Sequence, residues 1–316
     1  AHGVAVNHSL QLSLLKYLYK HAGVRHLILE TSPADGYLHD YYLRTGDDKF
    51  LENSMYAYVK EERVFWQSLR TFNKHLPKKE QVRVFGVDHY EREPFIHAMH
   101  LMLFEEDTTK YIPQEMNDVY DQMGKSLANF QSHHKLRKLI KKGLEKYPDI
   151  YKQHLGKAYW HFKQILNSPL HRGNDRKRDK KMAQNILNIM KKFTKGNFFG
   201  IFGGCHTTNF EKMKNMKYYL AKSILLGSIL NFSTHHKNCE TYANGKKKKY
   251  TNIELLGYFA HRYVKQFDHL ILFDISLIIT NKELFAKKNL PFYEEFFLYI
   301  RNQDAYTFEN YFNKKK

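Results

Sequence analysis

The segment Asn197-Phe-Phe-Gly-Ile-Phe-Gly-Gly-Cys-His206 decides the fold predicted for this chain. Its short apolar run bounded by glycine is typical of a strand buried on both faces of a parallel sheet. Gly203 and Gly204 allow a sharp turn, so we expect His206 just beyond the carboxyl end of that strand. Ligands bind at this edge in open parallel sheets.

Two other segments have the same form. The apolar runs at residues 24–30 and 82–88 end in Glu30 and Asp88. Parallel strands bring their carboxyl ends to one edge, so we expect these carboxylates to lie near His206. His2 opens the chain in what reads as a strand-to-helix turn. We therefore expect a strand upstream of Ala1, and the sequence is compatible with a secreted, periplasmic or cytoplasmic protein.

Helical patterns alternate with these strands. We expect helices over residues 9–21, 34–44, 50–74 and 174–195, and this rhythm predicts an α/β fold with a mostly parallel central sheet flanked by helices. Residues 91–173 show no strand pattern, which predicts a helical insertion or cap in a core formed by residues 1–90 and 174–316. Beyond His206 we expect a strand at 227–234, an exposed loop at 235–250, a helix at 255–264, a strand at 270–275 and an aromatic-rich helical tail.

Composition limits the function classes. The chain has 316 residues and a formal net charge of +19. The charge is spread over many segments, so it indicates a lysine-rich, solvated surface, and no specific nucleic-acid partner is predicted. No apolar run is long enough to predict a transmembrane helix, and the 2 cysteines are too few for a disulfide framework. Nothing in the sequence indicates an oligomeric state.

The predicted strand-end residues suit hydrolysis by an activated water. A neutral histidine can act as general base, a carboxylate can orient the imidazole or polarise a water, and a second histidine can donate a proton or hold an oxyanion. Glu30 and Asp88 also have a structural interpretation, as helix caps or backbone acceptors. The sequence contains no Gly-x-Ser-x-Gly elbow, phosphate loop or dinucleotide fingerprint.

The remaining cysteine and histidine residues do not predict a further site. Cys205 is expected in the core, because adjacent residues on an extended chain point in opposite directions. The pairs His133-His134 and His235-His236 lack zinc-site spacing, and we expect both on the surface. No metal ligands are therefore predicted from spacing.

Several motifs, taken in order, resemble the erythromycin esterase-like family, which belongs to a wider group with the Tiki-type proteases and the ChaN haem-binding lipoproteins. The resemblance covers most of the chain outside residues 91–173. The matching pieces are Ala1-His2-Gly3 with Asn7, Leu29-Glu30, residues 66–73 followed by Phe85-Gly86-Val87-Asp88, Arg178-Asp179 with Met182-Ala183 and Asn185, Gly204-Cys205-His206, and Leu226-Gly227-Ser228-x-Leu230.

The resemblance implies metal-independent ester hydrolysis without a cofactor, with His2 as general base and Glu30 activating the water. His206 and Arg178 would assist, and Asn7, Asp88 and Arg178 would bind a medium-sized small-molecule ester. The family's Gly-Glu pair, which carries a carboxylate, would precede Ala1. Two alternatives stay open: a Tiki-type metal-dependent peptidase with the same histidines and Glu30 as ligands of a divalent metal, and a non-enzymatic protein that binds haem or another small ligand. Family membership does not fix the substrate.

Overall fold

The computed structural model describes residues 6–54, 59–106, 111–169, 175–207 and 214–223, together with the backbone of five short strands further along the chain. The chain forms two compact units. The first unit comprises Ala1–Lys16, Tyr58–Phe65 and Phe202–Lys316, and the second comprises Tyr17–Ala57 and Trp66–Ile201. Each unit is described by itself.

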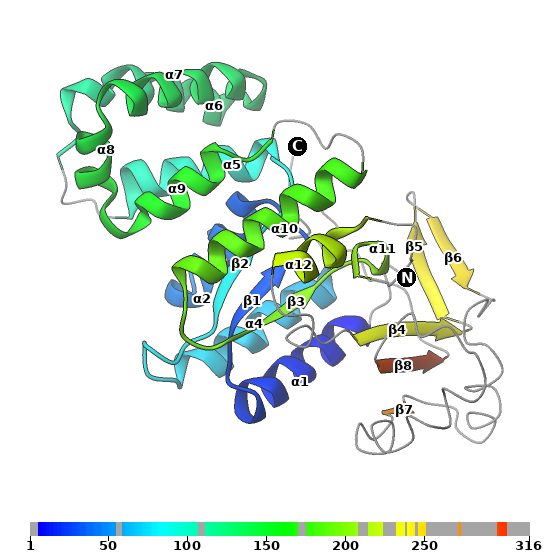
Figure 1. Ribbon diagram of the computed structural model, residues 1–316. Helices are drawn as coiled ribbons and strands as arrows, with labels where there is room; N and C mark the ends of the chain where they lie inside the picture. Colours follow the sequence, from blue (N-terminus) through cyan, green and yellow to red (C-terminus); the bar gives the residue numbers. More distant parts are fainter. Residues whose placement is uncertain are drawn as a thin grey trace. The chain divides into compact units, whose positions relative to one another are not determined.

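A three-stranded parallel sheet forms the centre of the second unit (Figure 1). Its strands are β1 (Val24–Leu29), β2 (Arg83–Gly86) and β3 (Asn197–Ile201), in the order β2-β1-β3. Leu29 lies opposite Gly86 on one side and opposite Ile201 on the other, so the three strands end together. The α/β fold class is confirmed, and the residues that follow each strand share one edge.

The interpretation of β3 as a strand buried on both faces is wrong. Asn197 and Gly200 are exposed, and Phe198, Phe199 and Ile201 are only half-buried. Among the strands that the structure describes, β3 pairs with β1 alone, whereas β1 has a partner on each side. The apolar residues of β1 and β2 are accordingly much more completely buried than those of β3.

Five helices accompany the sheet strands along the chain. They are α1 (Val6–His21), α2 (Pro33–Thr45), α3 (Asp48–Glu52), α4 (Lys60–Lys74) and α10 (Asp175–Lys192). The single helix expected over 50–74 is therefore divided. The first piece, α3, ends in a turn in which the N–H of Ser54 bonds Leu51 O at 3.2 Å and its hydroxyl bonds the same oxygen at 2.5 Å.

The described residues between Arg92 and Leu166 contain no strand. They form α5 (Arg92–His100), a π-helical turn at Leu101–Glu105, α6 (Asn117–Ala128), α7 (His133–Lys146), α8 (Pro148–Leu155) and α9 (Tyr159–Leu166), with short 3-10 turns between them. The assignment of 91–173 as an insertion or cap stays a prediction. In the described part of the chain, no helix combines the length and apolarity needed to cross a membrane.

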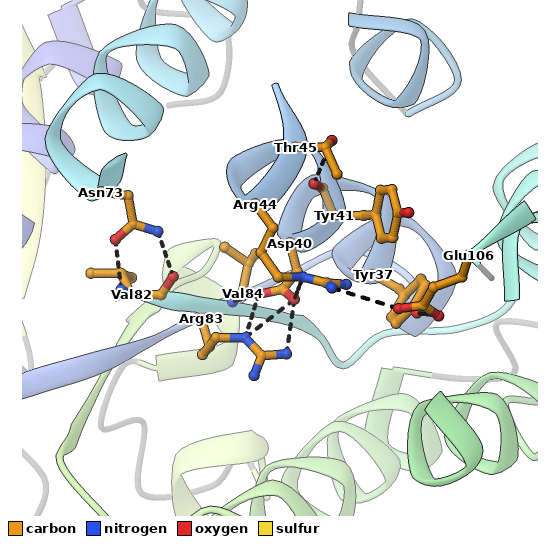
Figure 2. A network of polar contacts seen from close by, with 10 residues as sticks. All are labelled: Tyr37, Asp40, Tyr41, Arg44, Thr45, Asn73, Val82, Arg83, Val84 and Glu106. Atoms are coloured by element: carbon orange, nitrogen blue, oxygen red, sulfur yellow. Dashed lines mark hydrogen bonds and ion pairs between the residues drawn. The ribbon is translucent and has the colours of Figure 1, made fainter. Parts of the chain in front are cut away.

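A buried carboxylate attaches α2 to β2 (Figure 2). Asp40 accepts hydrogen bonds from Val84 N at 3.0 Å and from Arg83 Nε and Nη2, both at 2.9 Å. Arg44 Nε lies 3.3 Å from the same carboxylate. One side chain of α2 thus satisfies a backbone donor of β2 and pairs with two guanidinium groups, of which Arg44 also lies 3.5 Å from Glu106 Oε1.

The start of α2 comes unusually close to the end of β2. Ser32 caps the helix by accepting from Asp35 N at 3.1 Å. A Cβ atom on Gly36 would overlap the backbone of Phe85 and Gly86, and one on Gly86 would overlap the Ser32 carbonyl. Only glycine fits at both positions, and the contact fixes the loop that follows β1 against the strand end.

The first unit contains strands that sequence patterns predicted only in part. Residues 232–234 of the strand expected at 227–234 and residues 271–272 of the strand expected at 270–275 are confirmed as strand, whereas those at 239–243 and 246–250 were not expected. β4 (Phe232–Lys237) pairs in parallel with β8 (Phe296–Arg301), which also pairs with β7 (Ile271–Leu272), and β5 (Cys239–Ala243) pairs antiparallel with β6 (Lys246–Tyr250). The expected loop at 235–250 is wrong, and so is the helical tail at residues 296–301. The signal was present, because Asn-Gly separates β5 from β6 and is the strongest short hairpin signal. The predicted helix at 255–264 lies outside the described residues.

Two short helices of the first unit follow β3 along the chain, namely α11 (Gly204–Thr207) and α12 (Met216–Ser223). Cys205 is exposed, so its expected place in the core is wrong. The prediction assumed an extended chain, but the chain turns into α11 at this point. His133 is buried rather than on the surface, because its ring packs on Tyr90 and its Nδ1 lies 2.9 Å from Phe130 O.

Candidate active site

Two carboxylates meet at the carboxyl edge of the sheet in the second unit. Glu30 directly follows β1, and its N–H bonds Ile201 O at 3.2 Å. Asp88 lies two residues beyond β2, and its N–H bonds Thr31 O at 2.8 Å. The backbone ladder therefore continues past both strands and holds the two residues at neighbouring strand ends.

Arg178 joins these carboxylates. It lies in the first turn of α10, where its Nε donates to Asp88 Oδ1 at 2.8 Å and its Nη2 donates to Asp88 Oδ2 at 2.5 Å. The same Nη2 donates to Glu30 Oε1 at 2.7 Å. A bidentate guanidinium–carboxylate pair has a fixed mutual orientation, so Arg178 positions Asp88 firmly and holds one oxygen of Glu30.

The burial of these three groups differs. The side chains of Arg178 and Asp88 are 6% and 5% exposed, whereas that of Glu30 is 18% exposed. Burial by itself would raise the pKa of Asp88, but its contacts with Arg178 and His89 outweigh burial and hold the pKa below its usual range. Hydrogen bonds to Asp88 raise the pKa of Arg178 further above its ordinary value, against the effect of burial. Asp88 and Arg178 thus keep their charges at neutral pH, and Glu30 is the most exposed of the three side chains.

The helix that carries Arg178 is fixed to the same strand end. Asn185, two turns along α10, donates from Nδ2 to Val87 O at 2.7 Å. Val87 N bonds Leu29 O at 3.3 Å. The position of the guanidinium is therefore set by a second hydrogen bond between the helix and the strand end, independent of the carboxylates.

A second polar group adjoins the cluster, and sequence reasoning did not single it out. Thr31 Oγ1 donates to Asp35 Oδ2 at 2.5 Å, and both residues are buried. Burial first, and then the charge of Asp35, raises the pKa of Glu91 to about 8, against a lowering contribution from Ser32. Glu91 therefore holds a proton at neutral pH. The available signal was the run Thr31-Ser32-Pro33, which is a helix-start pattern.

The other predicted site residues belong to the first unit. His206 lies in α11, is buried, and its N–H bonds Gly203 O at 3.0 Å. His2 lies outside the described residues, and Asn7 is described only as part of the α1 backbone. The structure thus brings together Glu30, Asp88 and Arg178, and the meeting of these residues with the two histidines stays a prediction.

A cavity in the second unit lies against β2, and none of Glu30, Asp88 and Arg178 lines it. Its volume of about 20 Å³ accommodates about one water molecule, so it is too small to hold an ester substrate. Its walls come from Pro33, Tyr37, Val84, Phe85, Gly86, Trp160, His161, Gln164, Asn185 and Ile189. Within the described part of the chain, no three His, Cys, Asp or Glu side chains gather in an arrangement that could hold a metal ion.

Comparison with known proteins gives the relation of this fold to others. No protein-family model matches the chain, and no curated protein sequence is detectably similar to it. Among solved structures, it is similar to a succinoglycan biosynthesis protein (TM-score 0.68, 13% identity, covering 98% of this chain and 87% of that one). It is also similar to a Bacillus cereus protein (0.65, 15%, 98% and 88%).

A third similar structure is a mutant of the erythromycin esterase EreC in its open conformation (TM-score 0.55, 11% identity, covering 86% of this chain and 80% of that one). The chain shares the fold of these proteins. At such low identities the similarity concerns the fold alone, and it carries no residue role across.

Proposed function

We propose that the chain is a hydrolase of carboxylic esters that uses water as the nucleophile. The observation that carries the proposal is the cluster of Glu30, Arg178 and Asp88 at the carboxyl edge of a parallel sheet. This edge is where open α/β sheets bind ligands. A fold shared with an erythromycin esterase supports the reaction class, and a medium-sized ester is the substrate class we propose.

Glu30 is the residue that prepares the water. One of its oxygens, Oε1, is held by Arg178 at 2.7 Å, and the side chain remains partly exposed. A carboxylate fixed in this way can accept a hydrogen bond from a water and orient its lone pair toward a carbonyl carbon. Arg178 holds Glu30 in place.

The imidazoles would complete the reaction. In this proposal His2 takes a proton from the attacking water, and His206 stabilises the oxyanion or the leaving group. Substrate binding is assigned to Asn7, Asp88 and Arg178. Asp88 contributes indirectly, because its two hydrogen bonds with Arg178 fix the position of the guanidinium. No metal or cofactor is assigned a step.

The test is turnover of a panel of esters, from short acyl esters to macrocyclic lactones, by the purified protein. Glu30→Gln and His206→Ala are compared with Glu80→Gln, a carboxylate that is 38% exposed and pairs with Arg25. We expect losses of about 100-fold or more in kcat/KM for the two site variants and wild-type turnover for the control. Unchanged turnover in both site variants would remove this assignment.

The same preparation separates the hydrolase from the two alternatives. A stoichiometric divalent ion that is lost in His206→Ala, together with cleavage of peptides, would identify a metal-dependent peptidase. An absorbance band of bound haem without ester turnover would identify a ligand-binding protein. We expect neither.

A further inference from the structure

We propose that Arg137, Tyr90 and Arg92 form a binding site for a phosphate group in the second unit. Arg137 lies on α7, Arg92 is the first residue of α5, and Tyr90 lies in the loop between β2 and α5. The site uses none of the residues assigned to ester hydrolysis, and the inference does not depend on that function.

Arg137 is a buried cation that has no carboxylate partner among the described residues. It is 6% exposed. Its Nη2 donates to Leu166 O at 2.6 Å and to Ser168 O at 2.5 Å, whereas its Nε and Nη1 are buried without a hydrogen-bond acceptor. A buried charge is stable when an opposite charge and hydrogen bonds compensate it. The guanidinium therefore has unused donors and an unbalanced charge, both of which an anion would satisfy.

Tyr90 supplies a second unused donor. It is 8% exposed, and its hydroxyl is buried without a hydrogen-bond partner. Its ring lies 5.0 Å from Arg137 Cζ and packs on the ring of His133 at 5.6 Å, and its N–H bonds Pro169 O at 3.0 Å. The aromatic face attracts the guanidinium but carries no net charge, so it does not neutralise Arg137.

Arg92 adds a second positive charge beside the same hydroxyl. Burial raises the pKa of Tyr90, and the charges of Arg137 and Arg92 act against that effect. Burial lowers the pKa of Arg137, with a smaller opposing effect of Tyr90. Among the described groups, no carboxylate contributes to the pKa of either residue. Because Arg92 is exposed, we expect a ligand to approach from its side of the cluster.

A phosphate group matches these donors in charge and in number of acceptors. Its charge of about −1.5 to −2 near neutral pH balances two guanidinium groups. Its oxygens can accept hydrogen bonds from Arg137 Nε and Nη1, from the Tyr90 hydroxyl and from Arg92. A carboxylate has only two oxygens and a single charge, so it would leave part of this capacity unused. The ligand is therefore free phosphate or a small molecule that carries a phosphate group.

The experiment is calorimetric titration of the full chain with inorganic phosphate and with glycerol phosphate, at constant ionic strength. The site variants are Arg92→Gln and Tyr90→Phe, which both leave Arg137 and its bonds to the two carbonyls in place. Lys135→Gln is the matched control, because Lys135 is an exposed cation on α7. We expect saturable binding at one site per chain in the wild type and the control, and an affinity about 10-fold or more lower in each site variant. Tighter binding of glycerol phosphate than of phosphate would support the site and identify a small molecule as the source of the group.

Thermal unfolding provides a second measurement and reports whether each variant is folded. Phosphate should raise the melting temperature of the wild type and of the control more than that of either site variant. Wild-type affinity in both site variants, absence of saturable phosphate binding by the wild type, or saturable binding of acetate without binding of phosphate would each overturn the proposal. Ester turnover does not enter any of these outcomes, so the site and the proposed function are tested separately.

Discussion

Replacing Asp40 with asparagine should destabilise the second unit by about 2–3 kcal/mol at neutral pH. The Asp40 side chain is 1% exposed and lies 2.9 Å from Arg83 Nη2 and 3.3 Å from Arg44 Nε. Burial alone would raise its pKa, but Arg83 and then Arg44, with the bond from Val84 N, lower the pKa to about 2 from its ordinary value of 3.8. At about 1.4 kcal/mol for each pKa unit, the folded environment favours the ionised form by about 2–3 kcal/mol.

The loss in Asp40→Asn has two parts. The variant removes the negative charge from two guanidinium groups, and it offers an amide where three donors need an acceptor. Breaking a buried pair costs about 3–5 kcal/mol when the remaining charge is fully buried. Arg83 and Arg44 are 32% and 34% exposed and keep some hydration, so we expect the lower figure.

The pH dependence has a definite sign. Because the pKa of Asp40 is lower in the folded protein than in the unfolded chain, its contribution is complete above a pH of about 4 and is lost as the pH falls toward about 2. The free energies of unfolding of wild type and Asp40→Asn should therefore differ most at neutral pH and converge in acid.

Urea unfolding followed by tryptophan fluorescence measures this effect. The 2 tryptophans of the chain, Trp66 and Trp160, both lie in the second unit with Asp40. Glu80→Gln is the control, because its pair with Arg25 is partly exposed and should contribute less than about 1 kcal/mol. A loss below about 0.5 kcal/mol in Asp40→Asn at pH 7, or an equal difference at pH 7 and pH 3, would refute the reasoning.

Three further perturbations test the same edge of the sheet. Gly86→Ala should lower the free energy of unfolding by about 3 kcal/mol or more, or prevent folding, because the new methyl group would overlap the backbone of the loop after β1. A melting temperature within about 3 °C of wild type would contradict the close approach of that loop to Gly86. Glu91→Gln should stabilise the protein by on the order of 2 kcal/mol at pH 9 and much less at pH 5. The folded-state pKa of Glu91 is raised to about 8, so above that pH the wild type must ionise a buried carboxyl and becomes less stable, whereas glutamine stays neutral. Denaturant titrations at both pH values measure the difference, and equal effects would count against a buried, protonated Glu91. Arg178→Ala should lower stability by about 3–5 kcal/mol by leaving Asp88 buried without its partner, and Arg178→Lys should recover less than half of that loss, because one ammonium cannot replace a bidentate fork; full recovery by lysine in thermal unfolding would show that charge alone matters.

The sequence by itself determined the three parallel strands and the helices between them. Apolar runs that end in Glu30 and Asp88 have the length and composition of strands, and parallel pairing brings strand ends together whatever lies between them. Local sequence patterns gave a wrong prediction where pairing with another strand decides whether a segment becomes a strand or a loop. The strands β5 and β6 formed in a lysine-rich segment whose composition reads as a loop, although the Asn-Gly between them signals a hairpin, because pairing between strands supplies hydrogen bonds that composition does not encode.

Only the tertiary structure decided how the strand-end residues interact. That Arg178 holds both oxygens of Asp88 and one of Glu30 depends on how α10 lies on the sheet, and a bond from Asn185 to Val87 sets that position. The proton retained by Glu91 depends likewise on burial and on the charge of Asp35, which is distant in the chain. Residue type fixes which chemistry a side chain can perform, but its charge state and its partner are set by the dielectric and the contacts that packing creates.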